Sequence, residues 1–323
     1  MAVTKLQNLV ILGTGGTIAG QAADPSDNIG YTAAQVGIGA LLAAVPALDQ
    51  DGPFITEQVA QIDSKDMSFA VWVQLAERVN HFLAQPDVQG VVITHGTDTL
   101  EETAYFLQAV CQPVKPVVLA CAMRPATALA PDGPQNLRDA VSVARHPGAQ
   151  GVVAICAGTI HSALDVQKVH TYRLDAFSSG DAGPVGYVEE GQLRLLRNWP
   201  QAQKSPLTIE KVAGLGALAE WPQVEIVMSH AGASGAVVQA LVAHGVQGLV
   251  VAATGNGTLH SALEAALWAA QDAGVKVVRA SRCTEGRVLS VPGQRIADSQ
   301  GLSPVKARVA LMLDLLAEND ERP

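Results

Sequence analysis

The sequence predicts an α/β fold, with a larger N-terminal domain holding a mainly parallel sheet between helices and a smaller α/β C-terminal domain. Two observations carry this prediction. Short apolar runs recur along the 323 residues, and each run is continuous rather than alternating, as is typical of parallel strands covered on both faces. Stretches with helical spacing lie between the runs, and alternation of strand and helix is typical of α/β domains.

Seven apolar runs are the expected strands. In chain order they are NLVIL (8–12), GVVIT (90–94), KPVVLA (115–120), GVVAIC (151–156), VEIVMS (224–229), GLVVAA (248–253) and VKVVRA (275–280). Valine, isoleucine, leucine and alanine dominate them, so we expect sheets that are buried between helices.

Helices are expected between these strands. Residues 69–83, FAVWVQLAERVNHFL, place apolar side chains at three- and four-residue spacing, which predicts one apolar stripe on an amphipathic helix. Residues 32–35 and 99–102 each fit the S/T-x-x-E/Q capping box and predict two helix starts. A serine followed by proline at 303–304 predicts the start of a C-terminal helix.

The weakest periodicity falls between the fourth and fifth strands, where proline, glutamine and lysine are mixed. We therefore expect a domain boundary there. The expected division is an N-terminal domain of residues 1–198, a linker of residues 199–222, and a C-terminal domain of residues 223–323.

Composition favours a small-molecule partner. The formal net charge is −9 and only 16% of residues are charged, which argues against a nucleic-acid partner because phosphate binding needs a basic face. No apolar run approaches the ~18 residues of a membrane span. The four cysteines form no C-x-x-C pair and the histidines have no metal-ligand spacing, so no metal is expected.

The first apolar run leads directly into the glycine-rich stretch GTGGTIAG (13–20), which leaves no room for a signal peptide. A cytoplasmic protein is the simplest expectation, and a periplasmic protein whose signal peptide had been removed would look the same. The stretch does not fit a dinucleotide fingerprint, because Ile18 stands where the third glycine belongs and no GK[ST] follows. No cofactor is therefore expected.

Hydroxyl groups, rather than phosphate-binding glycines, distinguish this loop. A second strand ends in a similar way, in THGTDTLEE, so that Thr14, Thr17, Thr97 and Asp98 all follow expected strands. In open α/β sheets ligands bind beyond the carboxyl ends of the strands, so these side chains can converge on one crevice. Helix N-termini at that edge also supply N–H groups for an anion.

A threonine hydroxyl is a weak nucleophile until a base removes its proton. Candidate bases are Tyr31, Lys168 and the histidines. Lys168 lies in LDVQKVHTY, which has no other lysine. A desolvated lysine can lose its proton and act as a base, whereas an isolated one is more often simply solvated, and the sequence alone leaves both interpretations open.

Several segments together resemble the bacterial L-asparaginase family, which includes the glutaminase-asparaginases. They occur in the family's order and span nearly the whole chain: TGGTIAG (14–20), THGTDTLEETAYFL (94–107), AMRPATALAPDGPQNL (122–137), DVQKVHTYRLDAFSS (165–179), GNG (255–257) and PVKARV (304–309). The resemblance implies hydrolysis of the side-chain amide of asparagine, and often glutamine, without a metal or organic cofactor.

The resemblance also implies catalytic roles. Thr17 would be the nucleophile that forms an acyl-enzyme, and Tyr31, on a mobile loop, would activate it. Thr97, Asp98 and Lys168 would form a second constellation, in which Lys168 helps to deprotonate Thr97 or the attacking water. Which threonine attacks first stays open.

Substrate-binding roles follow from the same resemblance. Asp98 would bind the α-ammonium of the substrate, Ser64 its α-carboxylate, and the Ala122 carbonyl the leaving amide nitrogen. Asn256 would reach the site from a neighbouring subunit, which implies a homotetramer built from intimate dimers.

Two departures from the family pattern concern the substrate's ammonium. Asp63, Ser64 and Lys65 stand where the family usually has Gly-Ser-Gln, and a lysine aimed at an ammonium would repel it. Either Lys65 pairs with Asp63 or with the substrate's carboxylate, or the preferred substrate differs from asparagine. Residues 282–302 are also shorter than in the family, and Glu285 does not align with the family's interface glutamate. Alternatives are therefore an amidase for a related amide that lacks a free α-ammonium, and a non-catalytic amino-acid sensor.

Overall fold

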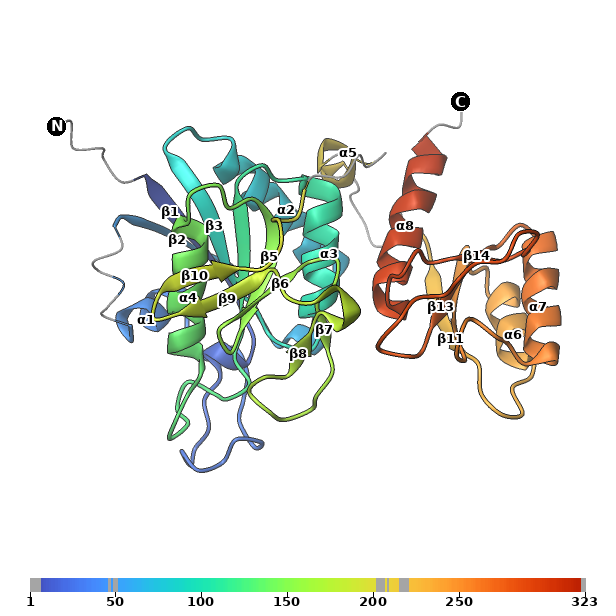
Figure 1. The fold of residues 1–323 in the computed structure, drawn as a ribbon, viewed down its shortest axis with the longest axis horizontal. Coiled ribbons are helices and arrows are strands. Elements are labelled where there is room, and N and C mark those ends of the chain that lie inside the picture. The colour runs from blue at the N-terminus through green and yellow to red at the C-terminus, as the bar shows by residue number, and fades with distance from the viewer. Residues whose placement is uncertain are drawn as a thin grey trace. The chain divides into compact units, whose positions relative to one another are not determined.

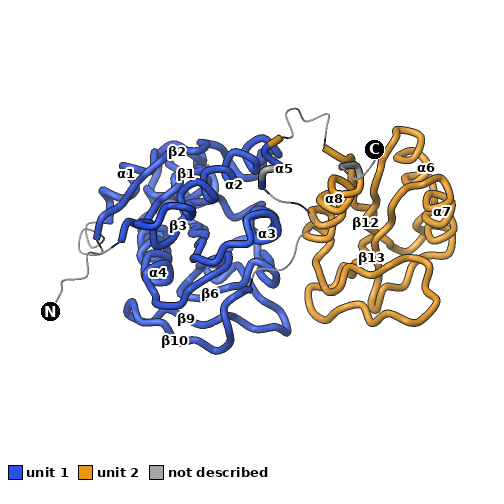
Figure 2. The backbone as a smooth tube through the Cα atoms, turned by 90° about the horizontal axis from the view of Figure 1, so that it is seen from above, with its two compact units in different colours: residues 1–213 blue, residues 214–323 orange. Residues whose placement is uncertain are grey.

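The computed structural model describes residues 7–45, 48, 52–201, 207, 209–214 and 221–320. The chain divides into two compact units, residues 1–213 and residues 214–323 (Figure 2). This division falls inside the segment expected as a linker, 199–222, which contains a short helix, α5 (Ile209–Ala213). Part of that segment lies outside the described residues.

Unit 1 is built on an eight-stranded sheet (Figure 1), whose strand order is β10-β9-β6-β5-β4-β3-β1-β2. The strands from β5 to β2 pair in parallel, and β6, β9 and β10 extend the sheet in antiparallel fashion. The bounds are β1 (Asn8–Gly15), β2 (Phe54–Ile62), β3 (Val88–Thr94), β4 (Pro116–Ala120), β5 (Gly151–Cys156), β6 (Thr159–Ser162), β9 (Gly186–Glu189) and β10 (Gln192–Leu195). The prediction of a mainly parallel sheet is confirmed.

Helices cover both faces of this sheet. The bounds are α1 (Ile38–Ala43), α2 (Phe69–Leu83), α3 (Leu100–Cys111) and α4 (Gly133–Arg145). Helices α1 and α4 share one core cluster with alternate strand residues such as Ile11 and Val118. Helices α2 and α3 pack against each other and against the sheet, with the Trp72 and Phe106 rings stacked 4.9 Å apart. Every residue of β4 and β5 is buried, as their continuous apolar sequences predict.

A two-stranded ribbon, β7 (Gln167–Lys168) with β8 (Phe177–Ser178), stands apart from the main sheet. Unit 1 also contains short 3₁₀ turns, among them η1 (Thr17–Ala19), η3 (Ser64–Asp66) and η4 (Gly180–Ala182). Two of these turns, η1 and η3, follow directly after strands of the sheet, and they become important at the site below.

Unit 2 has a four-stranded parallel sheet in the order β11-β12-β13-β14. Helices α6 and α7 share a core with one set of strand residues, whereas α8 packs on β11, β12 and β13. Leu311 and Leu315 of α8 come so close to Gly248 that a Cβ there would meet both. The bounds are β11 (Val224–Met228), α6 (Ala236–Ala243), β12 (Gly248–Ala253), α7 (Ser261–Asp272), β13 (Lys276–Ser281), β14 (Ala297–Asp298) and α8 (Pro304–Asp320).

The predicted helix start at residues 32–35 is wrong. Thr32 pairs with Gln21 in an isolated bridge, and the N–H of Gln35 donates to the Ala19 carbonyl. Ala34 has a positive φ of 56°, which a helix does not allow. Bonds to the turn after β1 therefore replace helical ones, and α1 begins only at Ile38.

The capping box at residues 99–102 predicts the start of a helix correctly, but the capping hydrogen bond is absent. Thr99 does occupy the N-cap of α3, but its side chain makes no capping hydrogen bond. Its hydroxyl instead donates to the Ser64 carbonyl at 2.8 Å. The predicted start of the C-terminal helix is confirmed, because α8 begins at Pro304.

Candidate active site

Four neighbouring strands of unit 1 carry polar groups at their carboxyl ends. The sheet places β2, β1, β3 and β4 side by side in parallel. Ser64 follows β2, Thr17 follows β1, Thr97 follows β3 and Ala122 follows β4. Because parallel strands end at the same edge, these residues come from one rim of the sheet.

The loops after β1 and β3 touch through their backbones. A Cβ built on Gly16 would lie 2.3 Å from both the Cα and the nitrogen of Gly96, a distance that no side chain can occupy. Gly16 also has a φ of 80°, which glycine adopts without strain. The Thr14 hydroxyl, buried, donates to the Thr94 carbonyl at 2.8 Å and ties the two strand ends together. Thr17 and Thr97, the residues that follow these glycines, are therefore held next to the contact.

Each threonine has its own partner. The Thr17 hydroxyl and the Tyr31 hydroxyl are 2.7 Å apart and share one hydrogen bond. Gly20 makes room for the tyrosine, since a Cβ there would lie 2.9 Å from the Tyr31 ring. Thr17 is only 7% exposed, so this hydrogen bond is largely shielded from water.

Lys168 of β7 connects the second threonine to a carboxylate. Its ammonium donates to the Thr97 hydroxyl at 2.8 Å and to Asp98 at 2.6 Å. The side chain of Lys168 is 20% exposed, whereas that of Asp98 is 51% exposed. The Lys168 backbone N–H donates to Glu101 at 3.3 Å, which fixes the ribbon against α3. Asp98 thus keeps an open side from which a ligand can approach.

Two backbone donors at the rim have no partner. Among the described residues, neither the N–H of Thr17 nor that of Thr97 donates a hydrogen bond. Both residues are almost buried, and buried N–H groups are nearly always paired. The pair of loops therefore presents donors that are free to bind a group placed at the rim.

Ser64 packs against the second loop. Its hydroxyl accepts the Asp98 backbone N–H at 3.2 Å, and a Cβ on Gly96 would lie 2.4 Å from the same hydroxyl oxygen. Because this oxygen accepts from Asp98, the proton of the Ser64 hydroxyl is left for another acceptor.

Lys65 points at acidic neighbours. Its ammonium lies 2.9 Å from Asp63 and 3.0 Å from Asp66. These hydrogen bonds, first that with Asp63, raise the pKa of Lys65. The side chain is 61% exposed. Of the arrangements that the sequence left open for this lysine, the structure has the pairing with Asp63.

Two further residues considered in the sequence analysis, Asn256 and Glu285, belong to unit 2. Asn256 belongs to unit 2, where its amide oxygen accepts the Leu289 N–H at 2.7 Å and its amide nitrogen donates to the Leu289 carbonyl at 3.4 Å. Glu285 is exposed in the same unit. Within the described ranges, no group of three or more His, Cys, Asp or Glu could hold a metal ion, and no described helix has the length and hydropathy needed to cross a membrane.

Family models match both units of the chain. Residues 8–201 match the model described as "Asparaginase, N-terminal", and residues 223–322 match "Glutaminase/Asparaginase C-terminal domain". The chain belongs to the asparaginase family. The family resemblance stated from the motifs is thereby confirmed.

Individual asparaginases are similar over nearly the full length. L-asparaginase 2 of Bacillus subtilis is 39% identical over 98% of this chain and 84% of its own length. The glutaminase-asparaginase of Pseudomonas fluorescens is 37% identical over 99% of this chain and 89% of its own. The crystal structure of a probable cytoplasmic L-asparaginase from Campylobacter jejuni superposes with a TM-score of 0.89 at 38% identity, covering 96% of this chain and 95% of that one.

Two features of the asparaginase rim had no role in the sequence analysis. His95 is fully buried before Gly96, with its Nδ1 bonded to the Gly96 carbonyl at 2.7 Å. Asp132 and Asn136 hold the backbone around Ala122. Apart from the bond between Asn136 and Asp132, the partners of all three are main-chain groups, which leave no complementary signal in the sequence.

We expect Gly16→Ala to separate the two loops. The added methyl group would meet the Gly96 backbone, and the positive φ disfavours alanine. We therefore expect the free energy of unfolding to fall by an amount on the order of 2 kcal/mol, which lowers the thermal midpoint by several degrees. Gly39→Ala is the matched control, because a Cβ there meets nothing within 4 Å and alanine suits helix α1. Equal midpoints for the two variants would contradict the close contact.

We expect His95 to make the protein less stable in acid. Burial lowers the pKa of His95 to about 4, below the ~6.5 of an unfolded chain. The unfolded state therefore binds more protons between these values, and stability present above pH 6.5 is lost as the pH falls towards 4. At about 1.4 kcal/mol per pKa unit, the loss is roughly 3 kcal/mol.

Urea denaturation at several pH values checks this expectation. His95→Gln should flatten the fall in unfolding free energy below pH 6.5, whatever its effect at neutral pH. His81→Gln, which changes an exposed histidine of α2, should leave the fall unchanged. An identical pH dependence for wild type and His95→Gln would refute the assignment.

Proposed function

We propose that this asparaginase hydrolyses the side-chain amide of L-asparagine to L-aspartate and ammonia through an ester on Thr17, and that it also accepts L-glutamine. The observation that carries the proposal is the pair of hydroxyls on touching loops, Thr17 bonded to Tyr31 and Thr97 bonded to Lys168. Two hydroxyls with separate proton partners suit a reaction with two proton-transfer steps, acylation and deacylation.

Acylation needs a base for Thr17 and an acid for the leaving group. In the proposed step the Thr17 oxygen attacks the amide carbon while its proton passes to the Tyr31 oxygen. The tyrosine's own proton passes to the leaving nitrogen, so ammonia departs and an aspartyl ester remains. Water then attacks the ester carbon and gives up a proton by way of the Thr97 hydroxyl, which the Lys168 ammonium holds in place. A proton returns to the departing Thr17 oxygen, so aspartate is released and both threonine hydroxyls are restored.

The unpaired backbone donors suit the oxyanion. Attack converts the carbonyl oxygen into an anion, and preorganised N–H groups stabilise it, typically by several kcal/mol for the set. The N–H groups of Thr17 and Thr97 flank the contact between the loops and have no partner in the described chain. We propose them as the donors.

The groups around Ser64 suit a free amino acid. The exposed face of the Asp98 carboxylate would bind the α-ammonium, and the free hydroxyl proton of Ser64 would bind the α-carboxylate. Asp63 and Lys65 form an ion pair beside them. Because this pair and Asp66 engage the lysine, its repulsion of an ammonium is reduced, which favours asparagine over an amide that lacks the α-ammonium.

We further propose that the chain forms a homotetramer of intimate dimers, in which Asn256 approaches a neighbouring subunit's site, and that it acts in the cytoplasm. The assembly is supported by the tetramer that the family resemblance implies. The location is supported by the description of the Campylobacter jejuni relative as a probable cytoplasmic L-asparaginase. A mass near four times 33.5 kDa by light scattering would support the assembly, and a monomer would contradict it.

We expect ammonia release from asparagine to depend on Thr17. The assay uses asparagine, glutamine and α-N-acetylasparagine. Thr17→Ala removes the nucleophile and should lower kcat at least about a thousandfold, whereas Thr56→Ala, on the exposed side of β2, should keep the wild-type rate. If only the acetylated compound released ammonia, the preferred substrate would be an amide that lacks a free α-ammonium, not asparagine. If the wild type released ammonia from none of the three compounds, an amino-acid sensor would be favoured.

We expect Lys65→Gln to change the KM for asparagine by less than about threefold. Exposed ion pairs contribute little because water and salt screen them, and the ammonium of Lys65 is already paired with two carboxylates. Steady-state kinetics at low and high salt check this. A KM that falls tenfold in the variant would show that the lysine repels the substrate directly.

A further inference from the structure

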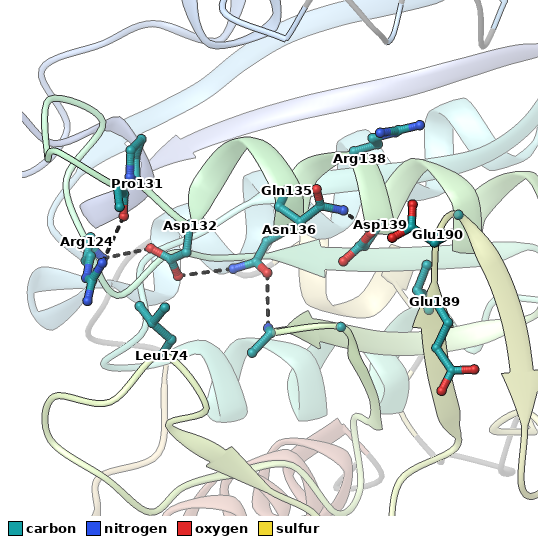
Figure 3. A pocket seen from close by; sticks show the side chains of 15 residues that line it. Arg124, Pro131, Asp132, Gln135, Asn136, Arg138, Asp139, Leu174, Glu189 and Glu190 are labelled. Carbon is teal, nitrogen blue, oxygen red and sulfur yellow. Dashed lines mark hydrogen bonds between the residues drawn. The ribbon is translucent and has the colours of Figure 1, made fainter.

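The carboxylate of Asp132 bonds the backbone on the far side of Ala122. Asp132 is the N-cap residue of α4, yet its side chain makes no capping bond to that helix. Its two oxygens instead accept two backbone N–H groups, that of Met123 at 2.9 Å and that of Arg124 at 3.0 Å, the second of which is drawn in Figure 3. A carboxylate that accepts two main-chain donors holds both peptide groups in one orientation.

Asn136, one turn along α4, bonds the backbone on the near side. Its amide nitrogen donates to the Cys121 carbonyl at 2.9 Å and to Asp132 at 3.2 Å. Its amide oxygen accepts the Ala157 N–H at 3.0 Å, so the side chain also reaches the turn after β5 (Figure 3). Asn136 is 1% exposed, and such buried bonds are costly to break.

The carbonyl between these bonds is left open. Among the described residues no donor bonds the Ala122 oxygen, although Ala122 itself is fully buried. The first residue of α4, Gly133, packs on Ile18 and Ala122, since a Cβ there would lie 2.9 Å from the one and 3.5 Å from the other. Helix α4 therefore contacts Ala122 and the residue after Thr17 together.

We propose that Asp132 and Asn136 are positioning residues that aim the Ala122 carbonyl at the leaving nitrogen of the amide. This inference rests on the proposed function. As the carbon–nitrogen bond breaks, the nitrogen gains a proton and positive character, so a carbonyl aimed at it binds the transition state more strongly than the substrate. Loss of that aim lowers kcat more than it raises KM.

Helix α4 offers a matched control residue for Asp132 and Asn136. Asp132, Asn136, Gln135 and Asp139 all line a cavity of about 700 Å³ beside α4. Asp139 is 3% exposed and accepts a hydrogen bond from Gln135 at 2.8 Å, and no bond connects it to residues 121–124. Asp139→Asn therefore changes a buried carboxylate of the same helix without touching the Ala122 backbone.

The test measures kcat, KM and thermal midpoint for asparagine hydrolysis. We expect Asn136→Ala and Asp132→Ala to lower kcat about 10- to 100-fold with KM within about threefold, because small misplacements of catalytic groups have effects of this size. Asp132→Asn should lie between them and the wild type, since one acceptor oxygen remains. Asp139→Asn should keep the wild-type kcat.

The outcomes separate this inference from the proposed function. If the wild type turns over, Thr17→Ala is inactive, and folded Asp132→Asn keeps the wild-type kcat, the positioning role is overturned and the proposed function stands. A rise in KM alone, or a lower thermal midpoint with normal kcat, overturns it equally. If the alanine variants do not fold, Asp132→Asn decides. A wild-type protein that does not hydrolyse asparagine overturns both proposals.

Discussion

The approach of Gly16 to Gly96 is the contact on which the rest of the site depends. It joins the ends of two adjacent parallel strands at a distance that excludes any side chain. The next residue of each loop is a threonine, so the contact fixes both hydroxyls relative to one another. Tyr31, Lys168 and Ser64 then bond or touch these loops rather than defining the site independently.

A rigid frame of satisfied groups surrounds a few unsatisfied ones. Of the strands behind the rim, β4 is completely buried and β1 and β3 are nearly so, and Thr14, Asp132 and Asn136 bond the backbone near it. Within this frame the N–H groups of the two threonines and the Ala122 carbonyl have no partner in the described chain. Groups left open in a fixed geometry need no rearrangement when charge develops on a bound amide, and such preorganisation is the main source of electrostatic catalysis.

The sequence predicted the parts of the fold in which local pattern and burial agree. Continuous apolar runs predict seven of the parallel strands, β1, β3, β4, β5, β11, β12 and β13, and a clear stripe predicts helix α2. The parallel strand β2 is half exposed, and β6, β9 and β10 are short, so these four lack such a signal. Thr17 and Thr97 could be predicted to converge because parallel strands share one carboxyl edge. Lys168 reaches them from a separate ribbon, so its place came only through the family resemblance, and the main-chain partners of Asp132 and Asn136 have no sequence signature.

The central claim is that Thr17, held beside Thr97 by the glycine contact, carries the acyl group. Acid quenching during asparagine turnover, followed by peptide mass mapping, tests it most directly. The account predicts an aspartyl ester on the peptide that contains Thr17, absent from Thr17→Ala. An ester on the peptide that contains Thr97, with none on Thr17, would contradict the account.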